Sequence, residues 1–587
     1  MNYLTLHICY IFKQFGHNKS IFLLSIPLIL SAFTHLWNPI GFPAVWVVEG
    51  QYMHRAMQVL EDFNYHYKQS SIYPYPYDHP FFGQYFLAGM LAVLGYPESL
   101  HLSSSSTTAA IARGDMTHSI EMLYLVPRVL IGLLAILDTF LVYKIAERRY
   151  DSNRTIALIA SILFAVMPIT WVLRKILLES LLLPLLLLSI LLALYTSKDQ
   201  IRRNYNSNKW RIIIIKNKNI PLVLLSGIFL GLAILTKIPI FTMIPLVGYL
   251  VYTSSNKNWK IVGLWLIPVI LIPLSWPVDA IINGDYDLWL KDLTWNIHRQ
   301  NNNNSAVGST LLNSLKYLFQ IEPVLLVLGF AGIFFAEIKR DFLILLWVAP
   351  FLIFLFIIDF VSFFHLIPLI PAFCIAAARM IVDASSRINH KKIHQILPFA
   401  IISGIGIFGI VNAAMLITTN VTSTYFKVYA YLVQYLVNEE KINDHNHNNN
   451  NIINDNNNVM IMIGRHWTRG LYWIPKYVYN TDLDFKKVDK VNDIPLSVKG
   501  EKAIIIVDNT IKRSLFDNTN NNDIQNSRLR QQLNPYYNTI PIAIFNDKST
   551  HYDLDKYPYT SMSENRDTKW VEIRANANGS KLAWDTY

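Results

Sequence analysis

The chain has 587 residues, of which 52% are hydrophobic and only 16% are charged. A soluble domain averages about 25% charged residues, so this composition excludes an ordinary soluble protein and indicates one that crosses a membrane several times. The net charge of +11 does not point to nucleic acid, because the Lys and Arg excess of a membrane protein normally lies in cytoplasmic loops. We therefore expect membrane lipids and no nucleic acid among its partners.

Apolar segments long enough to cross a bilayer, roughly 20 residues each, recur over the first 420 residues. The chain is predicted to be a polytopic α-helical membrane protein with about eleven spans and at most thirteen. The first span lacks a cleavage site behind it and is interpreted as a retained signal anchor. The predicted spans are 21–37, 124–146, 155–173, 178–196, 220–236, 238–254, 260–277, 323–337, 342–358, 364–382 and 396–418.

Two long outer loops are predicted between these spans. The first covers residues 38–120, and its apolar stretch Pro80–Tyr96 is expected to be an interfacial helix. Counting this stretch as a span would break the alternation of basic loops, so we place it on the outer surface. The second loop, Asp279–Glu322, carries His298 and Arg299. Polar and aromatic loops beside apolar spans are what a site acting on a lipid-borne substrate needs.

Three domains are predicted from the change in composition along the chain. Residues 1–420 form the membrane domain, and 421–458 are expected to be a polar linker. Residues 459–587 contain short β-branched runs, Val459–Gly464 and Ala503–Asp508, which alternate with polar, helix-compatible stretches. This pattern is typical of a small α/β domain, and we predict it to be soluble and extracytoplasmic.

Ionisable residues at the predicted outer ends of spans are the candidate site residues, because a charge buried there costs several kcal/mol without a partner or a role. They come from different loops and helix ends, but all map to the same side of the membrane. Such convergence predicts an active site at the outer interface. His298 and Arg299 of the second loop are further candidates for substrate binding at this site. The seven other candidates are Glu49, Asp78, His79, Arg174, Glu179, Lys237 and His365.

Each candidate also has a purely structural interpretation, and these alternatives stay open. Only the joint placement of the candidates favours a site. In chain order, the alternatives are an N-terminal helix charge for Glu49, a capping turn for Asp78–His79, a structural ion pair for Arg174 and Glu179, a lysine that snorkels to the headgroups for Lys237, and a structural helix-start histidine for His365.

A series of short motifs resembles the C-type glycosyltransferase superfamily. In order, they are the acidic motif EGQYMHRAM from Glu49, the motif DHPFFGQ from Asp78, Arg128 at the start of a span, Glu179 after the fourth span, Lys237 in a TK turn, and HLIPLIP from His365. Within that superfamily, the chain is similar to protein O-mannosyltransferases and aminoarabinose transferases, and an archaeal or bacterial member is expected. The resemblance covers about residues 20–420.

The resemblance implies a membrane glycosyltransferase. Such an enzyme moves a sugar, here expected to be a hexose such as mannose, from a polyprenyl-phosphate donor to a protein, lipid or glycan acceptor outside the plasma membrane. Because the motifs all precede residue 420, the tail is expected to be dispensable for the chemical step. The implied roles are general base for Glu49, second catalytic acid for Glu179, phosphate contacts for Lys237, Arg174 and Arg299, and pocket-shaping contacts for Asp78, His79, His298 and His365.

The chain departs from the family pattern at two acidic positions. Glu179 stands where aspartate is more common, which keeps the charge, and the larger departure is in the acidic motif. Relatives usually carry an Asp-Glu pair in the acidic motif, with the aspartate as the catalytic residue, whereas this chain has Val48–Glu49. Either Glu49 takes over the catalytic role, or the protein is impaired or inactive. The resemblance allows a divalent metal, but no recognisable metal-ligand spacing is present, so no metal ligand is predicted.

Two other functions remain as alternatives. A multi-span transporter or flippase would explain the many spans, although the charges gather at the outer span ends rather than at the midplane. A non-catalytic, glycosyltransferase-like assembly protein would explain Val48 and the external domain.

The Lys and Arg residues of the short loops predict the orientation of the chain. The strongly basic segment Lys198–Asn219 should face the cytoplasm, with the N-terminus on the same side and the C-terminal domain outside. A cysteine introduced at Asn208 in a cysteine-free background should react with a membrane-impermeant thiol reagent only after the membrane is opened. Labelling of this position in intact cells would contradict the predicted topology.

Overall fold

The computed structural model describes residues 23–43, 45, 47–61, 77–97, 115–150, 153–203, 220–298, 309–358, 360–388, 390–420, 422–447, 459–463, 471, 473–475, 484–487, 502–508, 539–546 and 570–576. The chain divides into two compact units. Unit 1 comprises Met1–Trp37, Asp62–Phe86 and Arg128–Leu416, and unit 2 comprises Asn38–Glu61, Leu87–Pro127 and Ile417–Tyr587.

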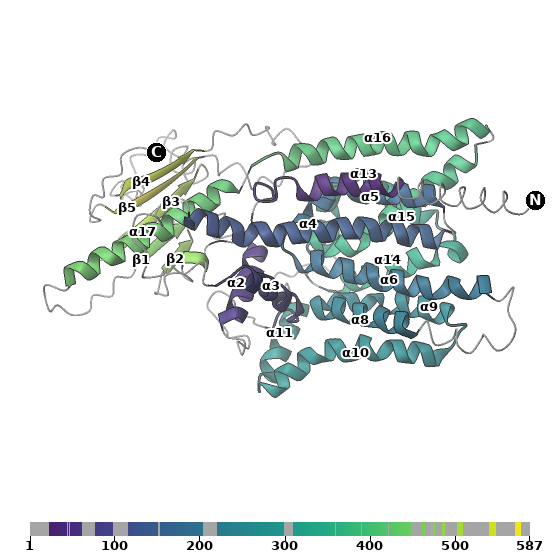
Figure 1. Ribbon diagram of the computed structural model, residues 1–587, viewed down its shortest axis with the longest axis horizontal. Helices are drawn as coiled ribbons and strands as arrows, with labels where there is room; N and C mark the ends of the chain where they lie inside the picture. The colour runs from purple at the N-terminus through teal and green to yellow at the C-terminus, as the bar shows by residue number, and fades with distance from the viewer. Residues whose placement is uncertain are drawn as a thin grey trace, which may run out of the picture. The chain divides into compact units, whose positions relative to one another are not determined.

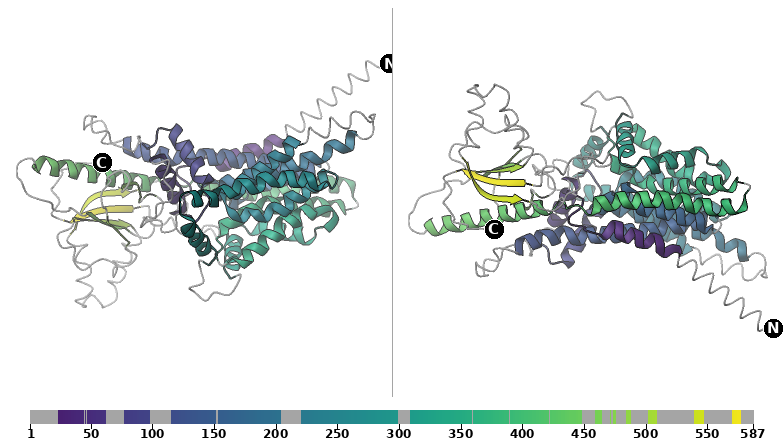
Figure 2. Two further views of the ribbon diagram at one scale, coloured as in Figure 1. Left: turned by 90° about the horizontal axis from the view of Figure 1, so that it is seen from below. Right: turned by 90° about the horizontal axis from the view of Figure 1, so that it is seen from above.

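Unit 1 is a bundle of helices. Its long helices run roughly alongside one another in all three ribbon views (Figures 1 and 2). Besides the helix Leu23–Leu36 and most of α4 (Asp115–Arg149), its elements are α5 (Arg154–Val166), η2 (Pro168–Arg174), α6 (Leu178–Arg203), α8 (Ile220–Thr236), η3 (Ile238–Met243), α9 (Ile244–Ser254), α10 (Trp259–Ile282), α11 (Tyr286–His298), α12 (Ser309–Ile321), α13 (Pro323–Phe334), α14 (Ile338–Ile357), η5 (Phe363–Leu369), α15 (Ile370–Ser386) and α16 (Lys391–Ile417).

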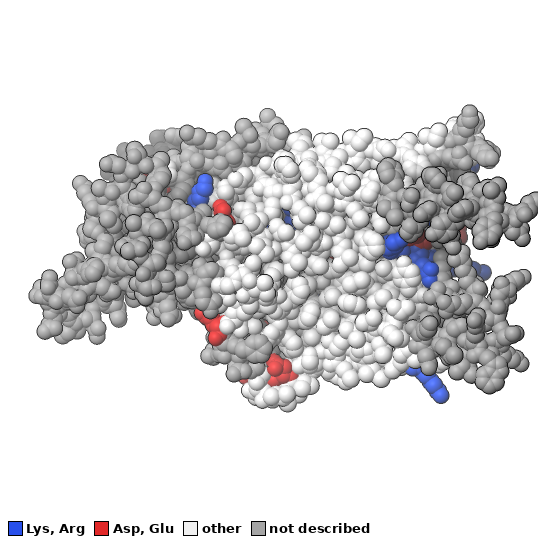
Figure 3. Space-filling model, in the orientation of Figure 1, with Lys and Arg blue, Asp and Glu red and all other residues white. Residues whose placement is uncertain are grey.

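This bundle has the length and surface of an integral membrane protein. Six helices of the described residues are long and apolar enough to cross a membrane, and the number rises to eight if each of two bent helix pairs is one span. The pairs are α5 with η2, bent by 67°, and α12 with α13, bent by 119°. The middle of the bundle surface carries almost no charged side chains, while Lys and Arg gather at one end (Figure 3).

The predicted number of eleven spans is not confirmed. Three of the predicted segments form apolar helices of only 14 to 17 residues, namely Leu23–Leu36, Ile220–Thr236 and Ile238–Ser254. Proline accounts for part of this shortening, because it lacks an N–H and cannot continue a helix. Pro239, for example, stands three residues after the last residue of α8 and in the first turn of η3. The count therefore stays a prediction.

Small residues let the helices of unit 1 approach closely. A Cβ added to Gly231 of α8 would lie 2.7 Å from the carbonyl oxygen of Pro268 in α10. The neighbouring pair α6 and α8 is joined by a hydrogen bond from the Ser189 hydroxyl to the carbonyl of Ser226 at 2.8 Å. Close backbones and inter-helix hydroxyl bonds are the usual means of packing helices in a membrane, where no hydrophobic force drives helix against helix.

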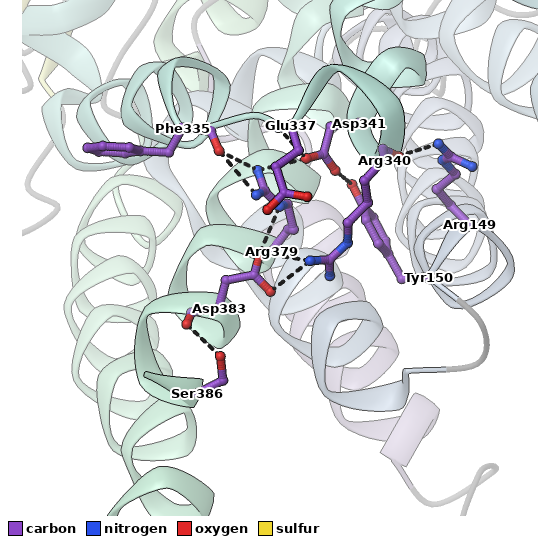
Figure 4. A network of polar contacts seen from close by, with 9 residues as sticks. All are labelled: Arg149, Tyr150, Phe335, Glu337, Arg340, Asp341, Arg379, Asp383 and Ser386. Atoms are coloured by element: carbon purple, nitrogen blue, oxygen red, sulfur yellow. Dashed lines mark hydrogen bonds and ion pairs between the residues drawn. The ribbon is translucent and has the colours of Figure 1, made fainter. Parts of the chain in front are cut away.

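A network of ion pairs fixes the start of α14 against α15 (Figure 4). Asp341 is fully buried and accepts hydrogen bonds from the Tyr150 hydroxyl and the Glu337 backbone N–H, each at 2.9 Å. It also forms a salt bridge with Arg379 of α15 at 2.9 Å. Arg379 in turn donates to the carbonyl oxygen of Phe335 at 3.1 Å. The carboxylate and the guanidinium are therefore each satisfied on several sides, as buried charges must be.

The same network has an exposed arm. Asp383 of α15 accepts from Arg379 at 3.0 Å and from Arg340 at 3.1 Å. The Arg340 side chain is 41% exposed. An exposed ion pair of this kind contributes little to stability because water and salt screen it.

Unit 2 contains a five-stranded mixed sheet with the strand order β2-β1-β3-β5-β4. β1 pairs in parallel with β2 and β3, whereas β5 pairs antiparallel with β3 and β4. Both β-branched runs predicted from the sequence are strands. The bounds are β1 (Val459–Ile463), β2 (Asp484–Lys487), β3 (Lys502–Asp508), β4 (Thr539–Asn546) and β5 (Trp570–Asn576). That these strands belong to a soluble α/β domain outside the membrane is not confirmed and stays a prediction.

The range expected to be a polar linker, 421–458, contains helix α17 (Ser423–His447). The helix buries Phe426, Tyr429 and Leu432 completely. These residues are spaced three apart, so they lie on one face of the helix. The Tyr431 hydroxyl donates to the carbonyl oxygen of Ile542 in β4 at 3.0 Å, so α17 is part of the core around the sheet.

The buried ion pair at the start of α14 should be essential for the stability of the bundle. Replacing Arg379 with Ala leaves Asp341 buried without its cation, and such a change costs about 3–5 kcal/mol. Arg340→Ala removes only the exposed arm and should cost no more than about 1 kcal/mol. Thermal unfolding in detergent should thus show a large loss of Tm for Arg379→Ala and a small one for Arg340→Ala. Equal losses would contradict the assignment.

Candidate active site

Three of the predicted site residues meet at one place in unit 1. Lys237 and Glu179 form a buried salt bridge between the Lys237 ammonium and Glu179 Oε1. His365 Nε2 lies 4.0 Å from the same carboxylate oxygen. The sequence left open an ion pair between Glu179 and Arg174. In the structure this carboxylate pairs with Lys237 instead.

Breaks in the helices place Glu179 and Lys237. Glu179 stands in the first turn of α6, where the positive end of the helix dipole favours a carboxylate. Lys237 follows the last residue of α8 and has extended backbone, with φ −155° and ψ 119°. Since Pro239 prevents α8 from continuing, the Lys237 side chain leaves the chain at a helix end rather than in the middle of a span.

His365 is held in one orientation by its own helix start. It is the third residue of η5, and its Nδ1 accepts the backbone N–H of Ser362 at 3.0 Å in a capping box. With Nδ1 acting as an acceptor, the proton of the neutral ring is on Nε2. That nitrogen is the one that faces Glu179, so the histidine presents a donor to the carboxylate.

The cluster lies in a largely apolar cavity. The side chains are 2% exposed for Glu179, 8% for Lys237 and 14% for His365. Glu179 Oε2 is buried and has no hydrogen-bond partner in the described part of the chain. The remaining cavity lining is apolar apart from these three residues and consists of Leu182, Pro239, Ile240, Phe351, Leu355, Ile358 and Pro368. A buried carboxylate oxygen with unused acceptor capacity can accept from a substrate hydroxyl.

The segment that carries Asp78 and His79 docks beside this cluster. Helix α3 (Phe82–Val93) begins just after it. A Cβ added to Gly83 would lie 2.2 Å from Leu178 Cδ2 and 3.9 Å from Thr236 Cγ2. Leu178 precedes Glu179 and Thr236 precedes Lys237, so the glycine lets the start of α3 approach the ion pair closely. Asp78 and His79 themselves are half-buried.

Residues of the second predicted outer loop fix the other side of this segment. Tyr77 donates its backbone N–H to Asp292 Oδ2 at 2.8 Å and its hydroxyl to Asp285 Oδ2 at 3.0 Å. Burial, followed by the contact with Asp285, raises the pKa of the Tyr77 hydroxyl, so it stays protonated and acts as a donor. The sequence did not identify Tyr77 and Asp292 as site residues. The available signal for Tyr77 was its position directly before the candidate Asp78.

An apolar cavity of about 360 Å³ adjoins the cluster. Ile238, the residue after Lys237, and Pro80, which follows His79, both line it. The rest of its wall comes from α8, η3, α9, α10 and α11 and includes Trp276 and Trp289. A charged cluster therefore stands at the edge of a cavity suited to a hydrocarbon chain.

Further buried cations precede α6 in the chain. Arg174 and Lys175 are each only 1% exposed, as is Arg128 of α4. Arg174 donates to the carbonyl oxygen of Trp37, and Arg128 is close enough to repel it electrostatically. The Lys175 ammonium lies 5.2 Å from the centre of the Trp171 ring. Two neighbouring guanidinium groups are a suitable environment for a phosphate, which they bind by charge-assisted hydrogen bonds.

The other predicted site residues include Glu49, His298 and Arg299. Glu49 belongs to unit 2, where it lies fully buried in the first turn of α2 (Val47–Glu61). His298 is the last residue of α11, and Arg299 lies outside the described residues. Over the described ranges, no group of three or more His, Cys, Asp or Glu side chains is arranged to hold a metal ion.

Comparison with known proteins finds one family model and several solved structures that are similar to the chain. The family model of dolichyl-phosphate-mannose-protein mannosyltransferases matches residues 64–278, which is less than half of the chain. The structure of apo ArnT from Cupriavidus metallidurans is similar over 96% of this chain and 100% of that chain, with a TM-score of 0.50 and 12% identity. The chain thus shares the fold of this ArnT structure and is similar to the mannosyltransferase family over residues 64–278.

Two further solved structures are similar to parts of the chain. The apo oligosaccharyltransferase of Archaeoglobus fulgidus matches 91% of this chain and 74% of that chain, with a TM-score of 0.49 and 11% identity. The S. cerevisiae Pmt1-Pmt2 complex matches 47% and 33%, with a TM-score of 0.30 and 16% identity. No curated protein sequence matches the chain.

The Lys237–Glu179 pair should behave as a coupled unit in this glycosyltransferase fold. Lys237→Met strands a buried carboxylate and should cost about 3–5 kcal/mol of unfolding free energy. Adding Glu179→Gln removes that charge, so the double variant should be more stable than the sum of the two single losses predicts. Thermal unfolding of the four proteins measures this coupling. Strictly additive losses would show that the two side chains do not interact.

Proposed function

We propose that this chain is a glycosyltransferase that moves a sugar from a polyprenyl-phosphate donor to a hydroxyl or amine acceptor at the outer face of the plasma membrane. The carrying observation is the buried Lys237–Glu179–His365 cluster at the edge of an apolar cavity. An ammonium beside a hydrocarbon-lined cavity matches a ligand with a phosphate head and a lipid tail. The family whose model matches the chain is described as using dolichyl-phosphate-mannose, which supports the same class of donor and a hexose such as mannose.

In this proposal the buried cations bind the donor phosphate. Lys237 has three N–H donors, of which the pairing with Glu179 uses one, so it can still donate to a phosphate oxygen. Arg174, with Arg128 beside it, supplies further fixed donors. Fixed cations of this kind also stabilise the negative charge that develops on the phosphate as the sugar leaves. The polyprenyl chain would lie in the apolar cavity next to Ile238.

Glu49 remains our proposed general base. It is the acid of the motif EGQYMHRAM, and the structure buries it completely at the start of α2. Val48, at the position of the usual family aspartate, is half-buried. Glu179 is paired with Lys237, so we propose that it holds this lysine in place and accepts from the substrate through its second oxygen. Asp78, His79 and His365 would shape the pocket around the sugar.

Two alternatives make different predictions in the same experiment. A flippase would move the lipid donor across a bilayer without cleaving it, and an assembly protein would bind partners with no turnover. The clustering of the charges at helix ends beside the Asp78 segment, rather than in the middle of spans, favours the transferase.

Transfer by the purified protein in nanodiscs tests the proposal. Radiolabelled polyprenyl-phosphate hexose should lose its sugar to a peptide, lipid or glycan acceptor, and Glu49→Gln should slow the transfer at least about a hundredfold. Gln preserves size and part of the hydrogen bonding, so thermal unfolding should change little. Val48→Asp, which restores the usual pair, should keep or raise the rate.

The controls separate the alternatives. An unchanged rate in a folded Glu49→Gln protein would eliminate Glu49 as the base, and activity found only with Val48→Asp would mean that the natural chain has lost its catalyst. Intact donor that crosses liposome membranes faster in the presence of the protein would favour the flippase.

A further inference from the structure

The acidic motif and the C-terminal tail, which are far apart in the sequence, belong to the same compact unit. Unit 2 joins Asn38–Glu61, which includes α2 and Glu49, to Ile417–Tyr587, which includes α17 and the sheet. The motif GRHWTRGLYW, Gly464–Trp473, has no role in the proposed function so far. Only its residues 471 and 473 are described, and both side chains are fully buried.

The direct link is a ring contact between α2 and the tail. The His54 imidazole stacks on the indole of Trp473, with ring centres 5.1 Å apart and an angle of 24° between the planes. His54 is 7% exposed and Trp473 is 0% exposed. His54 lies five residues, less than one and a half helical turns, after Glu49. A contact that fixes His54 therefore limits the rotation and the axial position of the helix start that carries the proposed base.

The loop before α2 is fixed by the start of the same tail. The Asn38 side chain donates to the carbonyl oxygens of Ile417 and Thr419 at 3.1 and 2.8 Å. The Thr422 hydroxyl donates toward the carbonyl oxygens of Gly41 and Pro43 at 3.4 and 3.2 Å. The segment is thus held on one side by the residues around 420 and on the other by Trp473.

We infer that the C-terminal tail positions the proposed base, with Trp473 and His54 acting as positioning residues rather than catalytic ones. The inference rests on the proposed function, since it concerns the geometry of that reaction. It differs from the expectation that the tail is dispensable for the chemical step. A displacement of about 1 Å at a reacting group can cost on the order of a hundredfold in rate, so a single lost ring contact has a measurable effect.

Substitutions on both sides of the contact test the inference. Trp473→Ala and His54→Ala remove the stack, whereas His54→Phe keeps an aromatic ring against the indole. We expect both Ala variants to lower kcat by about ten- to a hundredfold with less than a twofold change in the donor KM. His54→Phe should restore most of the rate. Tyr431→Phe is the matched control, because it removes a bond between α17 and β4 in the same unit without touching α2.

Hydrogen exchange of the peptides that cover α2 provides a readout independent of activity. Exchange in 47–61 should accelerate in the two Ala variants and not in Tyr431→Phe, because losing the stack loosens this helix locally. If the wild type is active, either of two results would overturn the positioning role alone. These are a kcat of His54→Ala equal to that of the wild type, and a loss of kcat in Tyr431→Phe as large as in His54→Ala. A second outcome would overturn the proposed function and with it the catalytic meaning of the contact. In that outcome the wild type transfers no sugar, although hydrogen exchange in α2 still accelerates in Trp473→Ala.

Discussion

The cost of burying charge in an apolar bundle is the constraint on which the rest of unit 1 depends. Lys237 and Glu179 form a salt bridge that compensates both charges. Each stands where a helix begins or ends, so neither charge lies in the middle of a span. Removing one partner would leave the other as an uncompensated buried charge. The surrounding elements are arranged around this requirement: Pro239 ends α8 at the right place, and the capping box of η5 turns His365 toward the carboxylate.

The same physics produces two kinds of polar cluster at the two ends of α14 and α15. At the start of α14, Asp341 accepts from the Tyr150 hydroxyl and the Glu337 backbone N–H, and Arg379 from α15 completes the pairing. Near its end, Glu179 keeps one buried oxygen without a partner beside a cavity that α14 helps to line. A fully satisfied network holds helices together, whereas a partly satisfied one retains capacity for a ligand. This difference is why the second cluster, and not the first, is our candidate site.

Unit 2 shows how the helix that carries the proposed base contacts a distant segment of the chain. α2 contains Glu49 and the polar residues His54 and Arg55, and these three side chains are buried. A helix of such mixed polarity is not held by an apolar stripe alone. Specific contacts also hold this segment. The Trp473 ring stacks on His54 in the helix, and hydrogen bonds from Asn38 and Thr422 fix the loop before it. The proposed base is therefore coupled to the tail through ordinary packing, without any need for the tail to touch the substrate.

Local patterns in the sequence determined the membrane class, most helix positions and the β-branched strands β1 and β3, because hydrophobic runs, prolines and short motifs act over a few residues. The sequence also singled out Glu179, Lys237 and His365 as separate residues on one side of the membrane. It could not pair them: which cation meets Glu179 depends on how α6, α8 and η5 pack, and Arg174 was an equally reasonable partner. Tyr77 with Asp285 and Asp292, and His54 with Trp473, join residues more than 200 positions apart. Contacts over such separations are set by the packing of whole helices, and only the tertiary structure decides them.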